Sequence, residues 1–337
     1  MPAPKTANFT VGKIPPASLL RSVLPFLGKN DSRIMVKAGV GRDAAVMRHE
    51  NKVLVFSADP VTGTTTHIGT HSVMVNANDI ATSGARPIWY LCTVLLPSGT
   101  NESYLRSVMV EIHEASMALG VAVLGGHTEV TPGLARPIIA GFMIGEAQPG
   151  RALSAADGRR GDLILLTKTA GIEGTAILAS DHSVKLVGLQ SSTLERARAF
   201  SKQISVVKEA LAIAGARGVH AMHDPTEGGV LNGLWELSEA SGLGIDAWAD
   251  KMSIARETEQ VCSPLGLDPL KLMSSGSLLV AVQPSEAGRV AARLRRMDVP
   301  VSEVGVLTAR GSGRNLFRNG RKLRLRAVPR DELYRLG

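Results

Sequence analysis

Short apolar segments of strand length alternate with longer helical patterns on both sides of one polar stretch near the middle of the chain. Before this stretch, KVLVFSAD, WYLCTVLLP and PIIAGFMIGE indicate strands, and helical patterns cover residues 69–82 and 101–119. After it, DLILLTK and SLLVAV indicate strands, and helical patterns cover residues 173–181, 202–215 and 285–296. Apolar runs bounded by Gly and Pro are typical of buried strands, whereas longer amphipathic runs favour helices. Mixed strands and helices in each half predict an α/β (α+β) protein.

The polar stretch GEAQPGRALSAADGRRGD covers residues 145–162 and is rich in Gly, Arg, Asp and Ala. Both of its flanks are short apolar segments, so it marks the division between two folded units. A chain of 337 residues is long enough for each unit to bury its own core. We therefore predict an N-terminal domain over residues 1–154 and a C-terminal domain over residues 155–337.

Several features predict a cytoplasmic protein that does not contact a membrane. No apolar run approaches the ~20 residues that span a bilayer, and the N-terminal segment MPAPKTANFT has no apolar stretch of the signal-peptide type. The two cysteines, Cys92 and Cys262, are too few for a disulfide scaffold and have no metal-type spacing.

The formal net charge of +8 is concentrated at the C-terminal end. From Arg310 onward the chain has nine Lys and Arg residues but two Asp and Glu residues, so the rest is close to neutral. The segment NLFRNGRKLRLRAV has an Asn-Gly turn between alternating residues, which predicts a solvated β-hairpin. A surface that contacts RNA or another anionic partner is the alternative. Because aromatic residues are not interleaved with the basic ones, we expect no nucleic-acid partner.

Carboxylates recur where an apolar segment gives way to a Gly-rich or polar turn. For any one of them, a turn or a helix cap is an adequate explanation. Together they suggest a site for Mg²⁺ and nucleotide phosphates, because hard cations take oxygen ligands. The carboxylates are Asp43, Asp59, Asp79, Glu129 and Asp224.

The segment HDPTEGGVLNGLWEL begins an apolar helical pattern with two adjacent glycines, although glycine costs about 1 kcal/mol per helical position relative to alanine. We expect Asp224 or Thr226 to cap this helix. Gly228 and Gly229 would leave its first turn without side chains, so that a phosphate could approach the N–H groups. A close contact between the helix and a strand is the alternative explanation.

Six segments occur in an order that resembles the aminoimidazole ribonucleotide (AIR) synthase superfamily, over roughly residues 10–310. They are GRDAAV, FSADPVTG, VNANDIATSGARP, GGHTEV, HDPTEGG and GLDPLKLMSSGSLLVAV. This superfamily includes AIR synthase, formylglycinamidine synthase, thiamine-monophosphate kinase, selenophosphate synthetase and the hydrogenase-maturation protein HypE. The resemblance implies an N-terminal domain that forms a β-barrel with a partner subunit in a homodimer, and a C-terminal α/β domain. It also implies that ATP and Mg²⁺ lie between the domains.

The resemblance carries the superfamily's site residues onto this chain. It implies that Asp43, Asp59, Asp79, Glu129 and Asp224 are metal ligands. It implies that the cofactor-binding positions are Asn76, Gly125, Gly126, Asp224, Thr226, Gly228 and Gly229. HDPTEGG and GGHTEV most resemble the HypE-related branch.

Three departures from the superfamily bear on the reaction. HypE proper ends in a cysteine that carries the group being dehydrated, whereas this sequence ends in LYRLG. Selenophosphate synthetases carry a reactive Cys or Sec near the N-terminus, and none is found here. The kinase branch has paired acids in its first motif, where this chain has Arg42 and Asp43. Arg42, His127 and His223 are the candidate catalytic residues, with a structural hydrogen bond as the alternative for each histidine.

Two classes of function follow. In the first, the protein is an ATP- and Mg²⁺-dependent enzyme that phosphorylates a small metabolite or activates an amide or carbonyl oxygen. A phosphotransferase like thiamine-monophosphate kinase is a variant of this class. In the second, the protein is a nucleotide-binding or partner-binding maturation factor without turnover. We favour the enzyme, because a scaffold has no use for buried like charges that need a metal.

Overall fold

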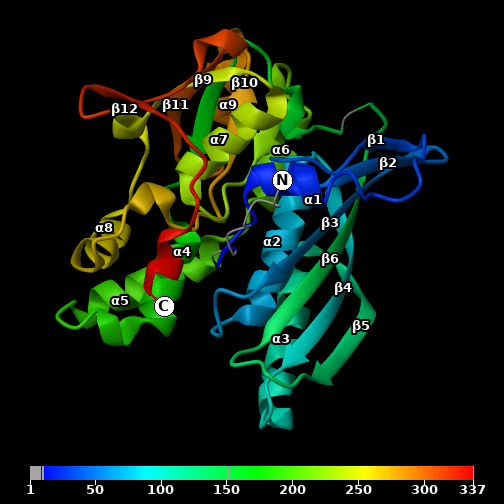
Figure 1. The fold of residues 1–337 in the computed structure, drawn as a ribbon, viewed down its shortest axis with the longest axis vertical. Helices are drawn as coiled ribbons and strands as arrows, with labels where there is room; N and C mark the ends of the chain where they lie inside the picture. The colour runs from blue at the N-terminus through cyan, green and yellow to red at the C-terminus, as the bar shows by residue number, and fades with distance from the viewer. Residues whose placement is uncertain (1–8, 10, 151, 337) are drawn as a thin grey trace, which may run out of the picture.

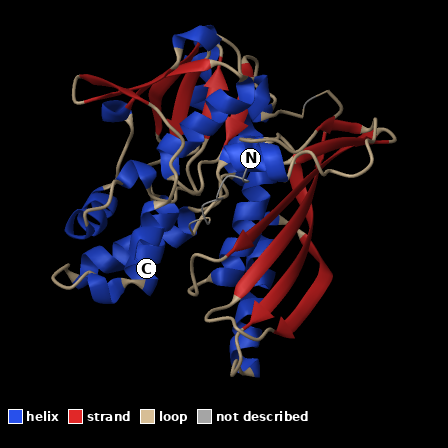
Figure 2. Ribbon diagram, in the orientation of Figure 1, coloured by secondary structure: helices blue, strands red, loops and turns tan. Residues whose placement is uncertain are grey.

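Two β-sheets of mixed strand direction, each covered by helices, make up the fold (Figures 1 and 2). The computed structural model describes residue 9 and residues 11–150 and 152–336. The first sheet is built before residue 150 and the second after residue 160. The fold class predicted from the alternating pattern is therefore confirmed, whereas the domain boundary at residue 155 stays a prediction.

The first sheet has six strands in the order β1-β2-β3-β6-β4-β5. Neighbouring strands are antiparallel except β4 and β5, which run parallel. Buried and exposed residues alternate along β3 and β4, as expected for strands with one covered face. The strands are β1 (Ile34–Val36), β2 (Ala45–His49), β3 (Lys52–Val61), β4 (Arg86–Leu96), β5 (Ala122–Val130) and β6 (Ile138–Ala147).

Helices α2 (Ile68–Thr82) and α3 (Glu102–Leu119) cover one face of this sheet (Figure 1). The Asn101 side chain accepts a hydrogen bond from the Tyr104 amide and so caps α3, which ends at the left-handed Gly120. Helix α2 is buried on nearly all sides, because it packs against the sheet, α3 and helix α6 of the second half. A short helix, α1 (Pro16–Ser22), precedes the sheet.

The second sheet has seven strands in the order β13-β12-β9-β11-β7-β10-β8, antiparallel except for β9 and β12. The basic segment forms the predicted hairpin, with Asn319 and Gly320 at positive φ in its turn. The strands are β7 (Leu163–Thr167), β8 (Val219–His223), β9 (Gly244–Trp248), β10 (Leu279–Val282), β11 (Val301–Thr308), β12 (Arg314–Arg318) and β13 (Arg321–Arg324).

Helices of the second half match the predicted patterns at 173–181 and 285–296 to within one residue. The pattern at 202–215 is only partly helical, because residues 199–203 form a separate 3-10 turn and the α-helix begins later. The helices are α4 (Ile172–Asp181), α5 (Ser191–Arg198), α6 (Val207–Ala214), α7 (Gly229–Ser241), α8 (Arg256–Cys262) and α9 (Pro284–Arg295).

Buried polar contacts join the two halves. The Asn78 side chain on α2 donates to the Ile204 carbonyl at 2.9 Å and accepts from the Val206 amide at 2.8 Å. The Asp181 carboxylate at the end of α4 accepts from the Thr64 hydroxyl and the Thr65 amide, both at 2.8 Å. These contacts hold the two sheets in one arrangement, so that residues from both can form a single site. None of the helices in the described ranges has the length and apolar character needed to cross a membrane.

Candidate functional site

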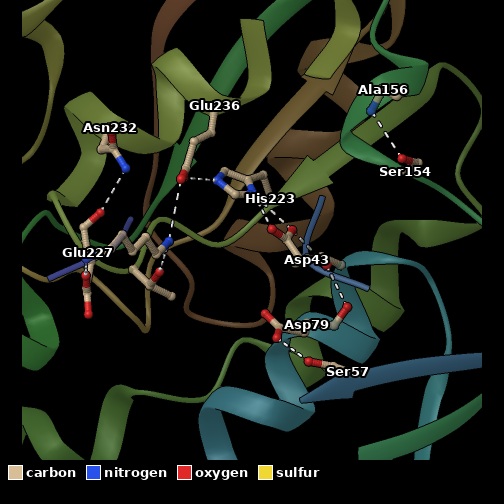
Figure 3. Close-up of polar contacts among 12 residues, drawn as sticks. Asp43, Ser57, Asp79, Ser154, Ala156, His223, Glu227, Asn232 and Glu236 are labelled. Atoms are coloured by element: carbon tan, nitrogen blue, oxygen red, sulfur yellow. Dashed lines mark hydrogen bonds and ion pairs between the residues drawn. The ribbon is translucent and has the colours of Figure 1, made fainter. Parts of the chain in front are cut away.

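Three carboxylates from different elements meet where the two halves join. Asp43 lies in the loop before β2, Asp79 lies on α2 and Asp224 directly follows β8. One oxygen from each lies within 4.8 Å of the others. The predicted acids at 43, 79 and 224 are thus brought together, and Figure 3 shows two of them, Asp43 turned toward His223 and Asp79 bonded to Ser57.

Two of these carboxylates are buried beside other negative charges. Asp224 is 1% exposed, and neither of its oxygens accepts a hydrogen bond from any residue in the described part of the chain. Burial, and then the Asp43 carboxylate, raise the pKa of Asp224 to about 7. Burial, followed by Asp59 and Asp224, raises the pKa of Asp79 well above its usual range, and the Ser57 hydroxyl donates to it. The cluster therefore has the charge and the free oxygen ligands that a divalent cation would complete.

His223, the last residue of β8, lies between two carboxylates (Figure 3). Its Nδ1 is 2.8 Å from an Asp43 oxygen, and its Nε2 is 3.0 Å from an oxygen of Glu236 on α7. Burial by itself would lower the pKa of His223, but the facing carboxylates outweigh it and raise the pKa to about 10. At neutral pH the ring is therefore an imidazolium that donates from both nitrogens.

The N-terminal segment reaches the same place through Lys13. Its ammonium donates to the Thr226 hydroxyl at 3.0 Å and lies 3.5 Å from Glu236. Its backbone amide donates to Glu227 at 2.9 Å. Burial would raise the pKa of Glu236, but Lys13 and His223 hold it at about 2. Lys13 thus places a positive charge beside the turn that precedes α7.

Asn76 holds the backbone of Asp59. Its side-chain oxygen accepts from the Asp59 amide at 3.0 Å, and its side-chain nitrogen donates to the Asp59 carbonyl at 3.1 Å. The side chain of Asn76 is fully buried and also donates to the Ser72 carbonyl. Asn76 therefore positions β3 against α2, and Asp59 lines the cleft next to the three carboxylates.

Backbone conformation and close packing explain the two glycines at the start of α7. Gly228 and Gly229 both have positive φ, and a Cβ on Gly229 would lie 2.6 Å from the Leu272 carbonyl oxygen. The expected cap by Asp224 or Thr226 is wrong, because the N-cap is Gly228 and no side chain caps from that position. The Gly228 amide instead donates to Asp331, at 2.6 Å.

A cleft of about 440 Å³ contains the cluster, and it is lined by Arg42, Thr226 and Trp235 as well as by the acids and His223. A second cavity of about 560 Å³ adjoins it and shares Lys13, Ile14, Asp59 and Thr226 as walls. Arg42 is exposed, and its guanidinium donates to the Lys37 carbonyl. The two cavities therefore meet at Lys13, and each has room for one bound chemical group.

Four predicted site residues lie apart from the three-carboxylate cluster, on β5. Gly125 and Gly126 both have positive φ, and a Cβ on Gly126 would lie 1.8 Å from the Cys92 carbonyl oxygen of the paired strand. His127 and Glu129 are exposed and contact one another at 3.1 Å. Neighbouring side chains, first the Thr131 hydroxyl and then His127, lower the pKa of Glu129. β5 is the edge strand of its sheet, so roles for these residues in binding ATP or metal stay predictions.

Three residues of the site were not predicted from the sequence: Lys13, Glu236 and Asp331. Glu236 lies on α7, one residue from the apolar face of that helix. Its burial beside His223 was not predicted from the sequence. Lys13 and Asp331 come from segments far from the acidic motifs, and no spacing rule connects them to the turn before α7.

Comparison with known proteins shows the family. The description "AIR synthase related protein, N-terminal domain" matches residues 41–147, and the corresponding C-terminal domain matches residues 159–315. The chain is 31% identical over 277 residues to the hydrogenase expression/formation protein MJ0676 of Methanocaldococcus jannaschii, covering 79% of this chain and 80% of that protein.

A second relative is carbamoyl dehydratase HypE of Rhodobacter capsulatus, 31% identical over 233 residues. That match covers 68% of this chain and 65% of HypE, slightly less than two thirds of its length. A crystal structure of the hydrogenase maturation protein HypE in complex with ATP has the same fold, with a TM-score of 0.71, 24% identity and coverage of 85% of this chain and 88% of that one. The motifs, the fold and these matches together show that the chain belongs to the AIR synthase-related family.

Proposed function

We propose that the chain is an ATP- and Mg²⁺-dependent enzyme that phosphorylates an oxygen of a small metabolite or activates an amide or carbonyl oxygen. The observation that carries this proposal is the cluster of Asp43, Asp79 and Asp224, which bring one carboxylate oxygen each to within 4.8 Å of one another. Relatives named carbamoyl dehydratase, and a HypE of the same fold that binds ATP, support it.

The residues of the cluster fit Mg²⁺. All of the donors are carboxylate oxygens, which are the ligands that hard cations prefer. Asp224 has two buried oxygens without a hydrogen-bond donor in the described residues, and burying such a group is unfavourable unless a cation or a donor satisfies it. Asp43, Asp79 and Asp224 would hold the ion, which would neutralise the charge that develops on the phosphoryl oxygens.

The surrounding residues would orient the reacting groups. Lys13 is placed between the two adjoining cavities, where its ammonium can meet the phosphate oxygens of a nucleotide. His223 holds its proton at neutral pH because it faces two carboxylates, so it is a poor general base. We propose that it positions Asp43 and does not take a proton from the substrate.

The acceptor is a separate molecule in this proposal. The two cysteines, Cys92 and Cys262, are both buried, and burial raises the pKa of each thiol. Neither can therefore present a thiolate to the cleft. The cavity that adjoins the cluster, lined by Arg136, Glu173 and Tyr334, offers space for a small acceptor or for the end of a maturation partner.

We also propose a homodimer formed through β5. This strand pairs only with β4 among the strands of the described residues, and all of its residues are exposed. Val123 and Leu124 are 40% and 55% exposed, and Trp89 and Phe142 add apolar surface on neighbouring strands. An exposed apolar edge strand is a template for pairing with another chain.

One observation favours the second candidate function, a nucleotide-binding or partner-binding factor without turnover. The Gly228 amide donates a hydrogen bond to the Asp331 carboxylate. A carboxylate of the chain itself therefore lies at the N-terminus of α7, where we expected a phosphate to bind. In that case ATP would bind through the carboxylate cluster, but no phosphate would be transferred.

Measurement of ADP release distinguishes the proposed enzyme from the non-catalytic factor. The purified chain would be incubated with ATP, Mg²⁺ and a panel of hydroxyl- and amide-bearing metabolites, alongside Asp79→Asn. Glu303→Gln, on the exposed surface of β11, is the matched control. The enzyme proposal predicts metabolite-dependent ADP release that Asp79→Asn abolishes and Glu303→Gln retains. ATP binding without ADP release for any metabolite would favour the non-catalytic factor.

A further inference from the structure

A third hollow, whose lining includes none of the three clustered carboxylates, lies between the end of α7 and the β12–β13 hairpin. It has a volume of about 940 Å³. One wall is formed by Trp235, Glu239 and Gly242 of α7 and its C-terminal cap, and the opposite wall by the basic hairpin. Figure 1 shows the hairpin extending from the second sheet beside α7. We refer to this hollow as the basic groove.

The groove is strongly positive. Its single acid, Glu239, is already paired with Arg314, whose guanidinium also lies 5.3 Å from the centre of the Trp235 ring. The other four cations are exposed and form no ion pair with any described residue. They are Arg310, Lys322, Arg324 and Arg326.

The hairpin that lines the groove also has an open strand edge. β13 is the last strand of its sheet and pairs only with β12 among the described strands. All four of its residues are exposed, and Leu323 is an apolar residue between two cations. Backbone N–H and C=O groups on such an edge can pair with an added strand.

We propose that the basic groove binds an acidic, extended peptide segment of another protein, which adds to the edge of β13. The free cations supply charge complementarity, and the strand edge supplies backbone hydrogen bonds. RNA fits less well, because the aromatic ring of the groove, Trp235, is covered by Arg314 and offers no stacking surface. A second copy of this chain also fits poorly, because its alternating acids, Glu257 and Glu259, lie in helix α8 and not in an extended strand.

The groove adjoins the cleft that contains the carboxylates. Trp235 and Ala327 line both. A peptide held along β13 would therefore bring the protein that carries it next to the candidate active site. This inference does not depend on the proposed ATP chemistry, because the groove contains none of the carboxylate ligands.

Fluorescence anisotropy without nucleotide tests the proposal. The probes are fluorescein-labelled octapeptides of alternating Glu and Val, alternating Gln and Val, and alternating Glu and Pro. We expect the Glu-Val peptide to bind, with an affinity that falls as salt increases, and both other peptides to bind at least about tenfold more weakly. Absence of Glu-Val binding would overturn the proposal, and equal binding of the Glu-Pro peptide would overturn strand addition.

Charge reversal locates the binding. Lys322→Glu with Arg324→Glu should weaken Glu-Val binding at least about tenfold. Arg293→Glu with Arg296→Glu, exposed at the end of α9, is the matched control and should bind like the wild type. Equal binding by both double variants would contradict the assignment to the groove. Tighter binding of a single-stranded oligouridine, lost in the Lys322 and Arg324 variant, would assign the groove to RNA instead.

Discussion

The Nδ1 atom of His223 lies 2.8 Å from a carboxylate oxygen of Asp43, and this contact joins the second sheet to the loop before β2 of the first. Glu236 faces the other ring nitrogen. The imidazolium therefore lies between the carboxylate cluster and α7, and we expect it to stabilise the arrangement of the two sheets.

Replacing His223 should destabilise the protein in a pH-dependent way. The pKa of His223 is raised to about 10 in the folded state, so its contribution is fully present below about pH 6.5 and is lost as pH rises through about 10. His223→Gln leaves the half-buried Asp43 carboxylate without its counter-charge and leaves Glu236 with Lys13 alone, which should lower the free energy of unfolding by about 3 kcal/mol at pH 7. Urea unfolding with EDTA at pH 7 and pH 10 measures this. A difference from wild type that does not shrink at pH 10 would contradict the imidazolium assignment.

Removing one charge from the carboxylate cluster should stabilise the metal-free protein. Asp224→Asn breaks no hydrogen bond with a described residue and relieves the repulsion by Asp43 and Asp59. In EDTA at pH 8, the variant should be more stable than wild type by a few kcal/mol, on the order expected for a buried carboxylate. Addition of Mg²⁺ should raise the Tm of wild type but not of the variant. A Tm in EDTA that is lower for the variant would show that Asp224 is satisfied without a metal.

The Asp331 carboxylate should make the free energy of unfolding decrease as pH rises. Burial raises its pKa to about 7, despite hydrogen bonds from the amides of Leu333 and Gly228. Because the folded pKa exceeds the unfolded value of 3.8, the folded state binds the proton more tightly, and stability falls as pH rises from about 4 to 7. Asp331→Asn cannot ionise, so its free energy of unfolding should change less than that of wild type between pH 5 and pH 8. Denaturant titrations at the two pH values measure the slopes, and equal slopes would refute the raised pKa.

Charges on β5 should separate the proposed dimer. Val123→Lys with Leu124→Lys adds two cations to the exposed edge strand and should give a monomer in light scattering after size exclusion. Val184→Lys with Val187→Lys is the matched control, since these valines are 80% and 90% exposed in another part of the chain. A monomeric wild type, or a dimer that persists in the β5 variant, would exclude this interface.

The sequence predicted β3, β4, β6, β7 and β10 and most helices, because their apolar runs are strong and are bounded by Gly and Pro. Strands β1, β8, β9 and β11 were not predicted. The helix at 202–215 was predicted too long, since periodicity does not distinguish a 3-10 turn from the first turn of an α-helix. The hairpin at Asn319 and Gly320 was predicted correctly, because turn chemistry is local.

The carboxylate cluster was predictable in part. Asp43 lies just before β2, Asp79 lies within α2 and Asp224 directly follows β8, and their segments match an ordered set of family motifs. The contacts of Lys13 and Asp331 depend on how segments far apart in sequence pack over the turn before α7. No local pattern encodes such packing. The cap of α7 was assigned to the wrong residue for the same reason.

Calorimetric titration with ATP, with and without Mg²⁺, tests the central claim most directly. It should be done on wild type, Asp224→Asn and the control Glu303→Gln, with folding confirmed for each. We predict Mg²⁺-dependent ATP binding by wild type and Glu303→Gln, and none by Asp224→Asn, because in this proposal Asp224 would supply ligand oxygens to the ion. Absence of ATP binding by the folded wild type, or equal Mg²⁺-dependent binding by Asp224→Asn, would contradict the claim that this cluster holds the metal and the nucleotide.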